Sequence, residues 1–190
     1  MKKAMTIVII GILFMGVGTV VVAQSQSTTL SQKETAQLQK ITSQSPSNPM
    51  RVYSYSANIN SVITQGGHNN NKWILSDTSV LYLPTSNKPA EGGNTVLYAH
   101  NRKNLFGNLK YLKKGDYVIV ENEANDTFVY RVYEKEEIKP SQTEKINTNI
   151  SDTLTLFTCD GAFDQKRLVI KAKLVQSIQG TTHKSSPTKV

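Results

Sequence analysis

Between Met50 and Val175 the hydrophobic residues form short runs, and in several runs they alternate with polar residues. The alternation is clearest in 128–133 and 168–174, and a period of two is typical of a strand with one buried face. The runs are rich in Val, Ile, Tyr, Thr and Phe, which favour strands, and turn residues separate them. The predicted strands are Arg51–Tyr55, Ala57–Ile63, Val80–Leu83, Thr95–Ala99, Tyr117–Glu121, Thr127–Tyr133, Thr153–Thr158 and Leu168–Val175.

One segment of this region departs from the strand pattern. Between Asn104 and Leu112 the apolar residues are Leu105, Phe106 and Leu109, a spacing that suits a short helix or 3-10 turn. About eight strands in ~125 residues, with almost no long helix, are typical of a closed or nearly closed β-barrel. We therefore expect an all-β, eight-stranded barrel with short helical connections.

The chain begins with a different pattern. Lys2 and Lys3 precede the uncharged, largely apolar stretch Ala4–Ala23. Twenty helical residues at ~1.5 Å each span a ~30 Å hydrocarbon core, and the lysines would keep the N-terminus in the cytoplasm. We expect a cytoplasmic stub (1–3), a single-pass membrane anchor (4–23) and an extracytoplasmic remainder. The alternative is a signal peptide cleaved after Ala23, which also places the remainder outside the cytoplasm.

Polar segments flank the strand-rich region. Gln24–Pro49 is rich in Ser, Thr and Gln, and it has too few large apolar residues to offset the entropy of ordering. It is predicted to be a flexible linker, followed by a folded, strand-rich domain over 50–176. The polar residues 177–190 are expected to form a disordered tail.

Charge and cysteine content narrow the function classes. The formal net charge is +8, but the basic residues form no long block and are not interleaved with stacking aromatics. With an exported topology, we expect no nucleic-acid partner. A single cysteine excludes an internal disulfide framework and a cysteine-based zinc or iron–sulfur site.

The last predicted hairpin carries the most informative residues. Cys159 follows the strand Thr153–Thr158, and Arg167 opens the final strand after a short loop. If these strands pair in antiparallel fashion, the thiol and the guanidinium lie at the same end of the sheet. A nearby cation favours the thiolate, which is the nucleophilic form of cysteine. The alternatives are a buried, inert cysteine and an ordinary surface arginine.

His100 is the candidate acid–base residue, because it ends the apolar strand Thr95–Ala99. A structural histidine at a strand end is the alternative. His68 lies in a polar loop and His183 in the tail, so neither has a positional argument, and the three histidines are too scattered to indicate a metal site.

Several segments resemble, in order along the chain, the motifs of the sortases, which are cysteine transpeptidases of bacterial cell envelopes. Thr155-Leu-Phe-Thr-Cys159 resembles the Thr-Leu-x-Thr-Cys motif, and Arg167 follows after a short loop. Gly92–His100 is similar to the strand that ends in the catalytic histidine. The segments 112–116 and 128–132 resemble the family's Leu-Lys-x-Gly-Asp turn and Tyr-x-Tyr-x-Val strand.

The resemblance covers roughly 50–175 and implies a β-barrel sortase fold; Ala99 stands where the family usually has Gly, and no subclass is assigned. It implies that Cys159 is the nucleophile, His100 the general acid and base, and Arg167 the group that stabilises the oxyanion or orients the substrate. The substrate would be an exported protein with a Leu-Pro-x-Thr-Gly-like signal near its C-terminus. An amine of a peptidoglycan precursor or a pilin would accept the acyl group.

The acceptor amine must outcompete water, so the site should be a groove for an extended peptide. The loops 79–94 and 134–152 are candidate walls, and the tentative groove residues are Ala99, Phe157 and Thr158. We expect no cofactor, although some sortases bind Ca²⁺ through loop carboxylates such as those of Glu134, Glu136, Glu137 and Glu144. Two other functions stay open: a cysteine peptidase that hydrolyses envelope peptides, and a tethered binding domain without activity.

Overall fold

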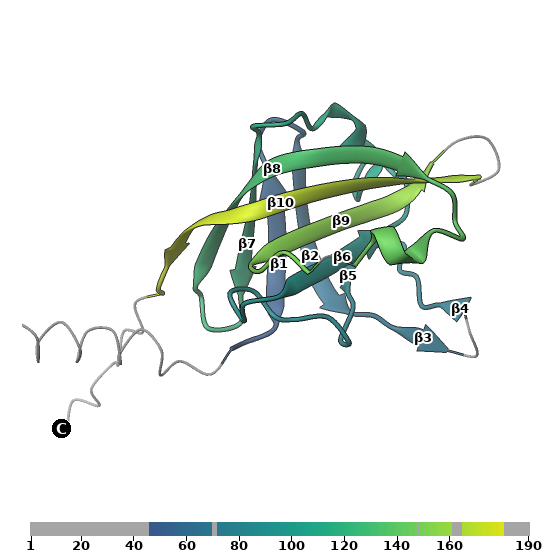
Figure 1. Ribbon diagram of the computed structural model, residues 1–190. Helices are drawn as coiled ribbons and strands as arrows, with labels where there is room; N and C mark the ends of the chain where they lie inside the picture. The colour runs from purple at the N-terminus through teal and green to yellow at the C-terminus, as the bar shows by residue number, and fades with distance from the viewer. Residues whose placement is uncertain (1–45, 70–71, 148, 161–164, 181–190) are drawn as a thin grey trace, which may run out of the picture. The chain divides into compact units, whose positions relative to one another are not determined.

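Eight strands close into a barrel in the order β1-β2-β5-β6-β9-β10-β8-β7 (Figure 1). The computed structural model describes residues 46–69, 72–147, 149–160 and 165–180. The barrel strands are β1 (Pro49–Ser54), β2 (Ile59–Gln65), β5 (Val80–Tyr82), β6 (Asn94–Ala99), β7 (Tyr117–Asn122), β8 (Thr127–Ile138), β9 (Thr153–Asp160) and β10 (Lys166–Ile178). The prediction of an all-β, eight-stranded barrel is confirmed.

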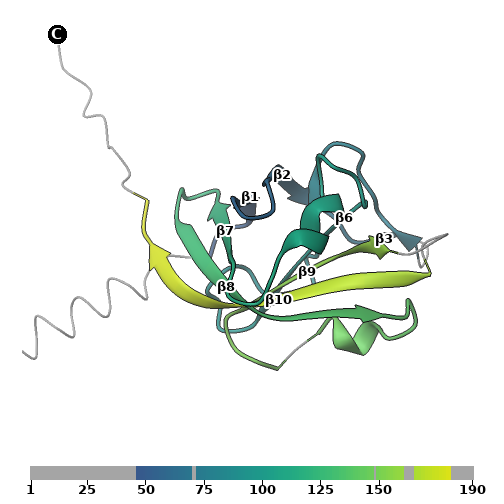
Figure 2. The same cartoon turned by 90° about the horizontal axis from the view of Figure 1, so that it is seen from above.

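The short elements lie outside this set of strands. The helix η1 (Gly107–Tyr111) is the predicted 3-10 turn, and η2 (Thr143–Lys145) lies in the connection between β8 and β9. Seen from above in Figure 2, η1 crosses the opening of the barrel, and η2 lies on its outside. The two-residue strands β3 (His68–Asn69) and β4 (Lys72–Trp73) form a small separate sheet that the sequence pattern did not predict.

The largest differences from the predicted boundaries are in the two longest strands. β8 continues to Ile138 rather than ending at Tyr133, and the added segment Glu134–Glu137 is charged. This segment reads as a loop in the sequence, but it pairs with the beginning of β10, where lysines face its carboxylates. The first part of the predicted wall loop 134–152 is therefore strand. β10 likewise continues to Ile178, beyond the predicted end of the domain at 176.

The strand pairing sets the position of the site. β6 and β9 are parallel, with Ala99 opposite Thr158, whereas β9 and β10 are antiparallel, with Cys159 opposite Arg167. β9 lies between two partners and is buried from Thr153 to Thr158, which explains why its sequence is a nearly continuous run of apolar and Thr residues.

Two hydrophobic clusters cover the two faces of the sheet formed by β5, β6, β9 and β10. The first fills the barrel and includes Leu97, Leu156 and Ile170, with Phe106 and Leu109 closing one end. The second lies on the outer face, where it joins Tyr98, Phe157 and Val169 to residues of the β8–β9 connection. Because neighbouring residues of a strand alternate between faces, each cluster takes every second residue.

The predicted stub, anchor and most of the linker lie outside the described residues, as does the end of the tail. Within the described part of the chain, no helix is long and apolar enough to cross a membrane.

Candidate functional site

Three adjacent strand ends bring the predicted site residues together. His100 directly follows the last residue of β6, and Cys159 follows Thr158, which pairs with Ala99. On the other side of β9, Cys159 pairs with Arg167. Neighbouring strands lie about 4.8 Å apart, so the three residues lie side by side at the ends of three adjacent strands.

The same three residues also share a face. His100 comes two positions after Tyr98, Cys159 two after Phe157, and Arg167 two before Val169. Tyr98, Phe157 and Val169 belong to the outer cluster, and alternation along the strands carries the site residues onto that outer face. Cys159 and Arg167 are half-buried, and the side chain of His100 is 29% exposed. The thiol, imidazole and guanidinium are therefore placed where a peptide can reach them.

Thr158 joins β9, which carries Cys159, to β6, which leads to His100. Its buried hydroxyl donates a hydrogen bond of 2.8 Å to the carbonyl oxygen of Ala99. At the other end of the same pairing, the hydroxyl of Thr155 donates to Oδ1 of Asn94, also at 2.8 Å. Both threonines of the motif thus fix the register that brings Cys159 beside His100.

This arrangement separates the three tentative groove residues. All three are buried, but Phe157 belongs to the cluster on the outer face with the site, whereas Ala99 belongs to the cluster that fills the barrel and Thr158 bonds to the Ala99 carbonyl oxygen. The structure therefore gives Ala99 and Thr158 a supporting place behind the site rather than a place in the wall of a groove.

The imidazole of His100 faces two charged residues that the sequence did not single out. Its Nε2 lies 3.7 Å from Oδ1 of Asp77, and the same oxygen lies 2.8 Å from Nη1 of Arg102. Arg102 comes two residues after His100, but Asp77 belongs to the loop between β4 and β5. No local pattern joins these segments, so the contact becomes visible only in the folded chain.

Arg167 is oriented by the chain beside it. Its Nη1 donates a 2.9 Å hydrogen bond to the carbonyl oxygen of Lys166. The ammonium of Lys166 instead pairs with Glu137 of β8. The predicted opposite facing of these two neighbours therefore leaves Arg167, and not Lys166, on the face of Cys159.

A cavity of about 330 Å³ lies on the same outer face. The β5–β6 loop contributes Leu83, Thr85 and Ser86, and the connection that contains η2 contributes Thr143 and Ile146. Segments of both predicted wall loops therefore line one cavity.

Aromatic rings connect this cavity to the site. Trp73, which also lines the cavity, packs edge-on against Tyr98 and Phe157 with ring centroids 4.8 and 5.4 Å apart. Tyr98 and Phe157 stack on each other at 5.4 Å. His100 and Cys159 follow these two buried residues by two positions, so the rings lie on the strands that carry the site residues. Trp73 lines the cavity, and the sequence analysis did not single it out.

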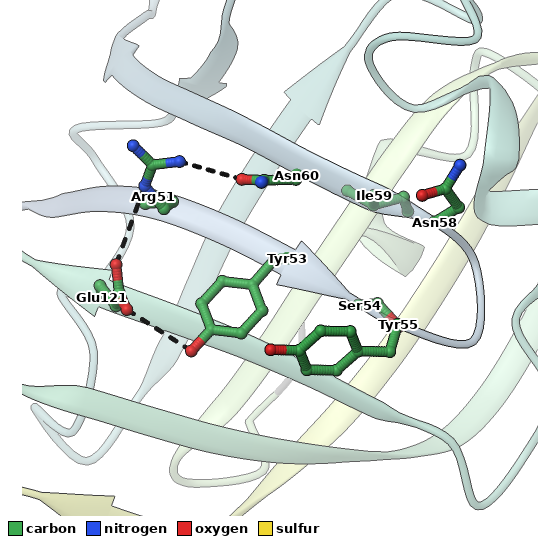
Figure 3. A pocket seen from close by; sticks show the side chains of 8 residues that line it. All are labelled: Arg51, Tyr53, Ser54, Tyr55, Asn58, Ile59, Asn60 and Glu121. Carbon is green, nitrogen blue, oxygen red and sulfur yellow. Dashed lines mark hydrogen bonds and ion pairs between the residues drawn. The ribbon is translucent and has the colours of Figure 1, made fainter.

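A second cavity, of about 380 Å³, lies over β1, β2 and β7 (Figure 3). Its polar side chains contact one another: Arg51 lies 3.8 Å from Glu121 and donates to Asn60 at 3.0 Å, and the hydroxyl of Tyr53 donates to Glu121 at 3.4 Å. Burial and the Glu121 carboxylate raise the pKa of Tyr53. Among the residues that the structure describes, neither a cysteine nor a histidine lines this cavity, so it is the weaker candidate site.

Three of the four glutamates offered as calcium ligands contact lysines. Lys171 lies 3.3 Å from both Glu134 and Glu136, Lys145 lies 3.0 Å from Glu136, and Lys166 pairs with Glu137. Burial raises the pKa of Glu136, but hydrogen bonds from Lys145 and Lys171 outweigh this effect and hold the pKa below its usual value. Within the described ranges, no three His, Cys, Asp or Glu side chains are grouped to hold a metal ion.

Known proteins are similar to this chain in sequence and in fold. A sortase A of Bacillus anthracis is 33% identical over 87 residues, which are 44% of this chain and 41% of that protein. The chain thus matches less than half the length of this relative. Among solved structures, Listeria monocytogenes sortase A aligns with a TM-score of 0.61 at 22% identity, over 73% of this chain and 93% of that one.

Sortase C1 of Streptococcus agalactiae aligns with a TM-score of 0.58 at 26% identity, over 67% of this chain and 66% of that one. The family model of the sortase domain matches residues 50–175, which is more than half of the chain. The resemblance inferred from the motifs is confirmed, and the chain belongs to the sortase family.

Proposed function

We propose that the protein is a membrane-anchored, extracytoplasmic cysteine transpeptidase. It cleaves a Leu-Pro-x-Thr-Gly-like signal near the C-terminus of an exported protein and transfers the acyl group to an amine of a peptidoglycan precursor or a pilin. The observation that carries the proposal is the strand register, which aligns His100, Cys159 and Arg167 across three neighbouring strand ends on one face. The membrane location rests on the proposed anchor over residues 4–23.

In the first half-reaction the thiolate of Cys159 attacks the carbonyl carbon of the signal's Thr. The carbon–sulfur bond forms, and the negative charge that develops on the carbonyl oxygen faces the guanidinium of Arg167. The C–N bond then breaks, and His100 donates a proton to the leaving amine. The product of this step is a thioester between Cys159 and the exported protein.

In the second half-reaction the acceptor amine attacks the thioester. His100 takes a proton from the amine, a new amide bond forms, and the thiolate of Cys159 leaves. Water can attack the same thioester, and that reaction gives hydrolysis. A transpeptidase therefore has to seat the acyl chain so that the amine reaches the carbonyl ahead of water.

The cavity beside Trp73 supports an extended, apolar peptide as the substrate. Trp73 lines the cavity and offers a flat apolar surface for Leu and Pro side chains, while the buried Phe157 packs edge-on against it; burying such surface stabilises the complex. Thr85 and Ser86 line the same cavity with hydroxyl groups that suit the polar backbone of a peptide. A pocket lined mainly by apolar side chains, with a few polar groups that fix the orientation of the ligand, is typical of a binding site.

The experiment that tests the proposal uses the chain from Pro46 onward with a panel of signal peptides, with and without an added amine, read by mass spectrometry. We expect an amide product that contains the amine, and a thioester on Cys159 when the amine is absent. Cys159→Ala should give neither product, because no other thiol exists in the chain. Ser177→Ala, in the far end of β10, serves as the control variant.

The possible outcomes separate the alternatives. Hydrolysis alone, unchanged by any amine, would identify a peptidase. Binding of an envelope component that Cys159→Ala leaves intact, with no cleavage of any peptide, would identify a binding domain.

A further inference from the structure

We propose that Asp77 is a positioning residue for His100, and that Arg102, which shares the Asp77 carboxylate, weakens the attraction between that carboxylate and the imidazole. The inference rests on the proposed function, in which His100 gives up and recovers a proton in each cycle. It is carried by one shared carboxylate oxygen: Oδ1 of Asp77 lies 3.7 Å from Nε2 of His100 and 2.8 Å from Nη1 of Arg102.

The loop that carries Asp77 is held in place by a chain of hydroxyl groups. Oγ of Ser76 accepts hydrogen bonds from the backbone N–H groups of Thr78 and Ser79, at 3.2 and 3.1 Å. The hydroxyl of Ser79 also lies 2.8 Å from both Oγ of Ser76 and Oγ1 of Thr64 in β2. The bend at Asp77 is thereby tied to the barrel wall, although the Asp77 side chain itself is 68% exposed.

The segment that carries His100 and Arg102 is equally constrained. The carbonyl oxygen of His100 accepts hydrogen bonds from the N–H groups of Arg102 and Phe106, at 2.8 and 3.2 Å. The carbonyl oxygen of Arg102 accepts from Leu105 and Gly107, both at 2.9 Å. Two independently fixed backbones therefore present the carboxylate, the imidazole and the guanidinium to one another.

A carboxylate at one ring nitrogen determines what the other nitrogen can do. When Nε2–H points to Asp77, the neutral ring carries its proton on Nε2, and Nδ1 is left to exchange a proton with the leaving and entering amines. The carboxylate also fixes the orientation of the ring. The distance of 3.7 Å is longer than a hydrogen bond, but such contacts in substrate-free sites tighten when the substrate binds.

Arg102 shares the carboxylate with the imidazole. It is the nearer partner of the Asp77 oxygen and carries a permanent positive charge, so the carboxylate is not paired with His100 alone. In this arrangement Asp77 orients the ring, and Arg102 in turn holds the carboxylate in place.

The test compares Asp77→Ala, Asp77→Glu and the wild type in the transpeptidation assay. We expect Asp77→Ala to lower kcat by about tenfold to a hundredfold with little change in KM, because removing a group that orients a reacting side chain has effects of this size. Asp77→Glu should recover part of the loss. Glu123→Gln removes an exposed carboxylate from the β7–β8 turn and serves as the charge-matched control.

A second measurement needs no substrate. Nitrogen-15 NMR of the His100 ring should show the Nε2–H tautomer in the wild type and a mixed population in Asp77→Ala. If Asp77→Ala keeps the wild-type kcat and tautomer, the inference is wrong; if its kcat falls only with its thermal stability, the role is structural and the inference is also wrong. If the wild type joins no peptide to any amine but the tautomer shifts as expected, the proposed function fails and the positioning contact stands.

Discussion

At the scale of single residues, Arg167 combines a fixed side chain with a charge on the face of the nucleophile. Nη1 donates a hydrogen bond to the carbonyl oxygen of Lys166, and this bond to the backbone sets the orientation of the planar guanidinium. A guanidinium presents several N–H donors in a rigid fork, whereas an ammonium is a compact point charge on a flexible stem. The role proposed for Arg167 therefore depends on shape as well as charge.

We predict that Arg167→Lys lowers kcat/KM for a signal peptide by about a hundredfold, the size expected for losing a preorganised donor to an oxyanion. Steady-state kinetics of the purified variant measures the effect. Lys166→Arg is the matched control, because it keeps the charge that pairs with Glu137 and lies on the opposite face. Wild-type kinetics for Arg167→Lys would show that the assigned role is wrong.

At the scale of elements, the turn that follows β6 fixes His100 from behind. The helix η1 packs Leu109 into the barrel, and it begins at Gly107, whose missing side chain lets the chain pass close to Arg102. A Cβ at Gly107 would lie 2.8 Å from the backbone carbon and oxygen of Arg102. Backbone atoms cannot swing away as a flexible side chain would, so this glycine is required by a close approach.

Gly107→Ala should therefore destabilise the fold by about 1–3 kcal/mol, the usual range for overpacking, and should displace the His100–Arg102 turn. Urea unfolding measures the first effect, and kcat of the folded protein measures the second. Lys110→Ala, at an exposed position of the same helix, is expected to change neither property. Unchanged stability and activity in Gly107→Ala would contradict the predicted clash.

At the scale of the whole molecule, a cluster of charges ties the wall of the groove to the barrel. Lys171 of β10 is 10% exposed and contacts Glu134 and Glu136 of β8, and Lys145 of η2 contacts Glu136. Burial lowers the pKa of Lys171, but hydrogen bonds and charge from the two glutamates outweigh it and raise the pKa above 10.5. The lowered pKa of Glu136 and the raised pKa of Lys171 therefore describe one stabilising pair.

These shifts set the pH window of the pair. Because the pKa of Glu136 is lowered by folding, its ionised form stabilises the fold at pH values above the unfolded pKa of 4.5, and this stabilisation is lost as the pH falls through the pKa in the folded protein. Because the pKa of Lys171 is raised by folding, its charged form stabilises the fold at pH values below 10.5, and this stabilisation is lost as the pH rises through the pKa in the folded protein. Lys171→Met should thus cost about 1.5–3 kcal/mol near neutral pH, the range for a hydrogen bond to a charged group.

Urea unfolding of the wild type and of Lys171→Met across the pH range measures this difference. We expect the difference to shrink as the pH falls from 4.5 through the lowered pKa of Glu136 in the folded protein. Lys173→Met, at a more exposed position of β10, is the comparison variant and should cost less. A difference that stays constant from neutral to strongly acidic pH would show that packing of the Lys171 stem, not its charge, carries the effect.

The sequence was sufficient for features that arise from short stretches of chain. Several barrel strands, such as β2, β7 and the first half of β8, show a period of two, and the β9–β10 hairpin pairs Cys159 with Arg167. The end of β8 was missed because its glutamates read as a solvated loop until β10 supplies the lysines opposite them. Asp77 and Trp73 were missed because they reach the site from a connection that only tertiary packing positions.

His100 stands between these two cases. Its own strand was predicted, but its approach to Cys159 depends on the parallel pairing of β6 with β9, which no local pattern contains. That His100 lies near Cys159 was expected only from the family resemblance of the motifs, and the pairing of Ala99 with Thr158 places the two residues side by side.

That parallel pairing has a temporal consequence. The cysteine and the arginine meet through a hairpin that can form early, whereas the histidine arrives only when strands from distant parts of the chain associate, as the Thr158–Ala99 bond across 59 residues illustrates. A partly folded chain would hold its sulfur nucleophile without the imidazole beside it. The three residues come together only after both the β9–β10 hairpin and the β6–β9 pairing have formed.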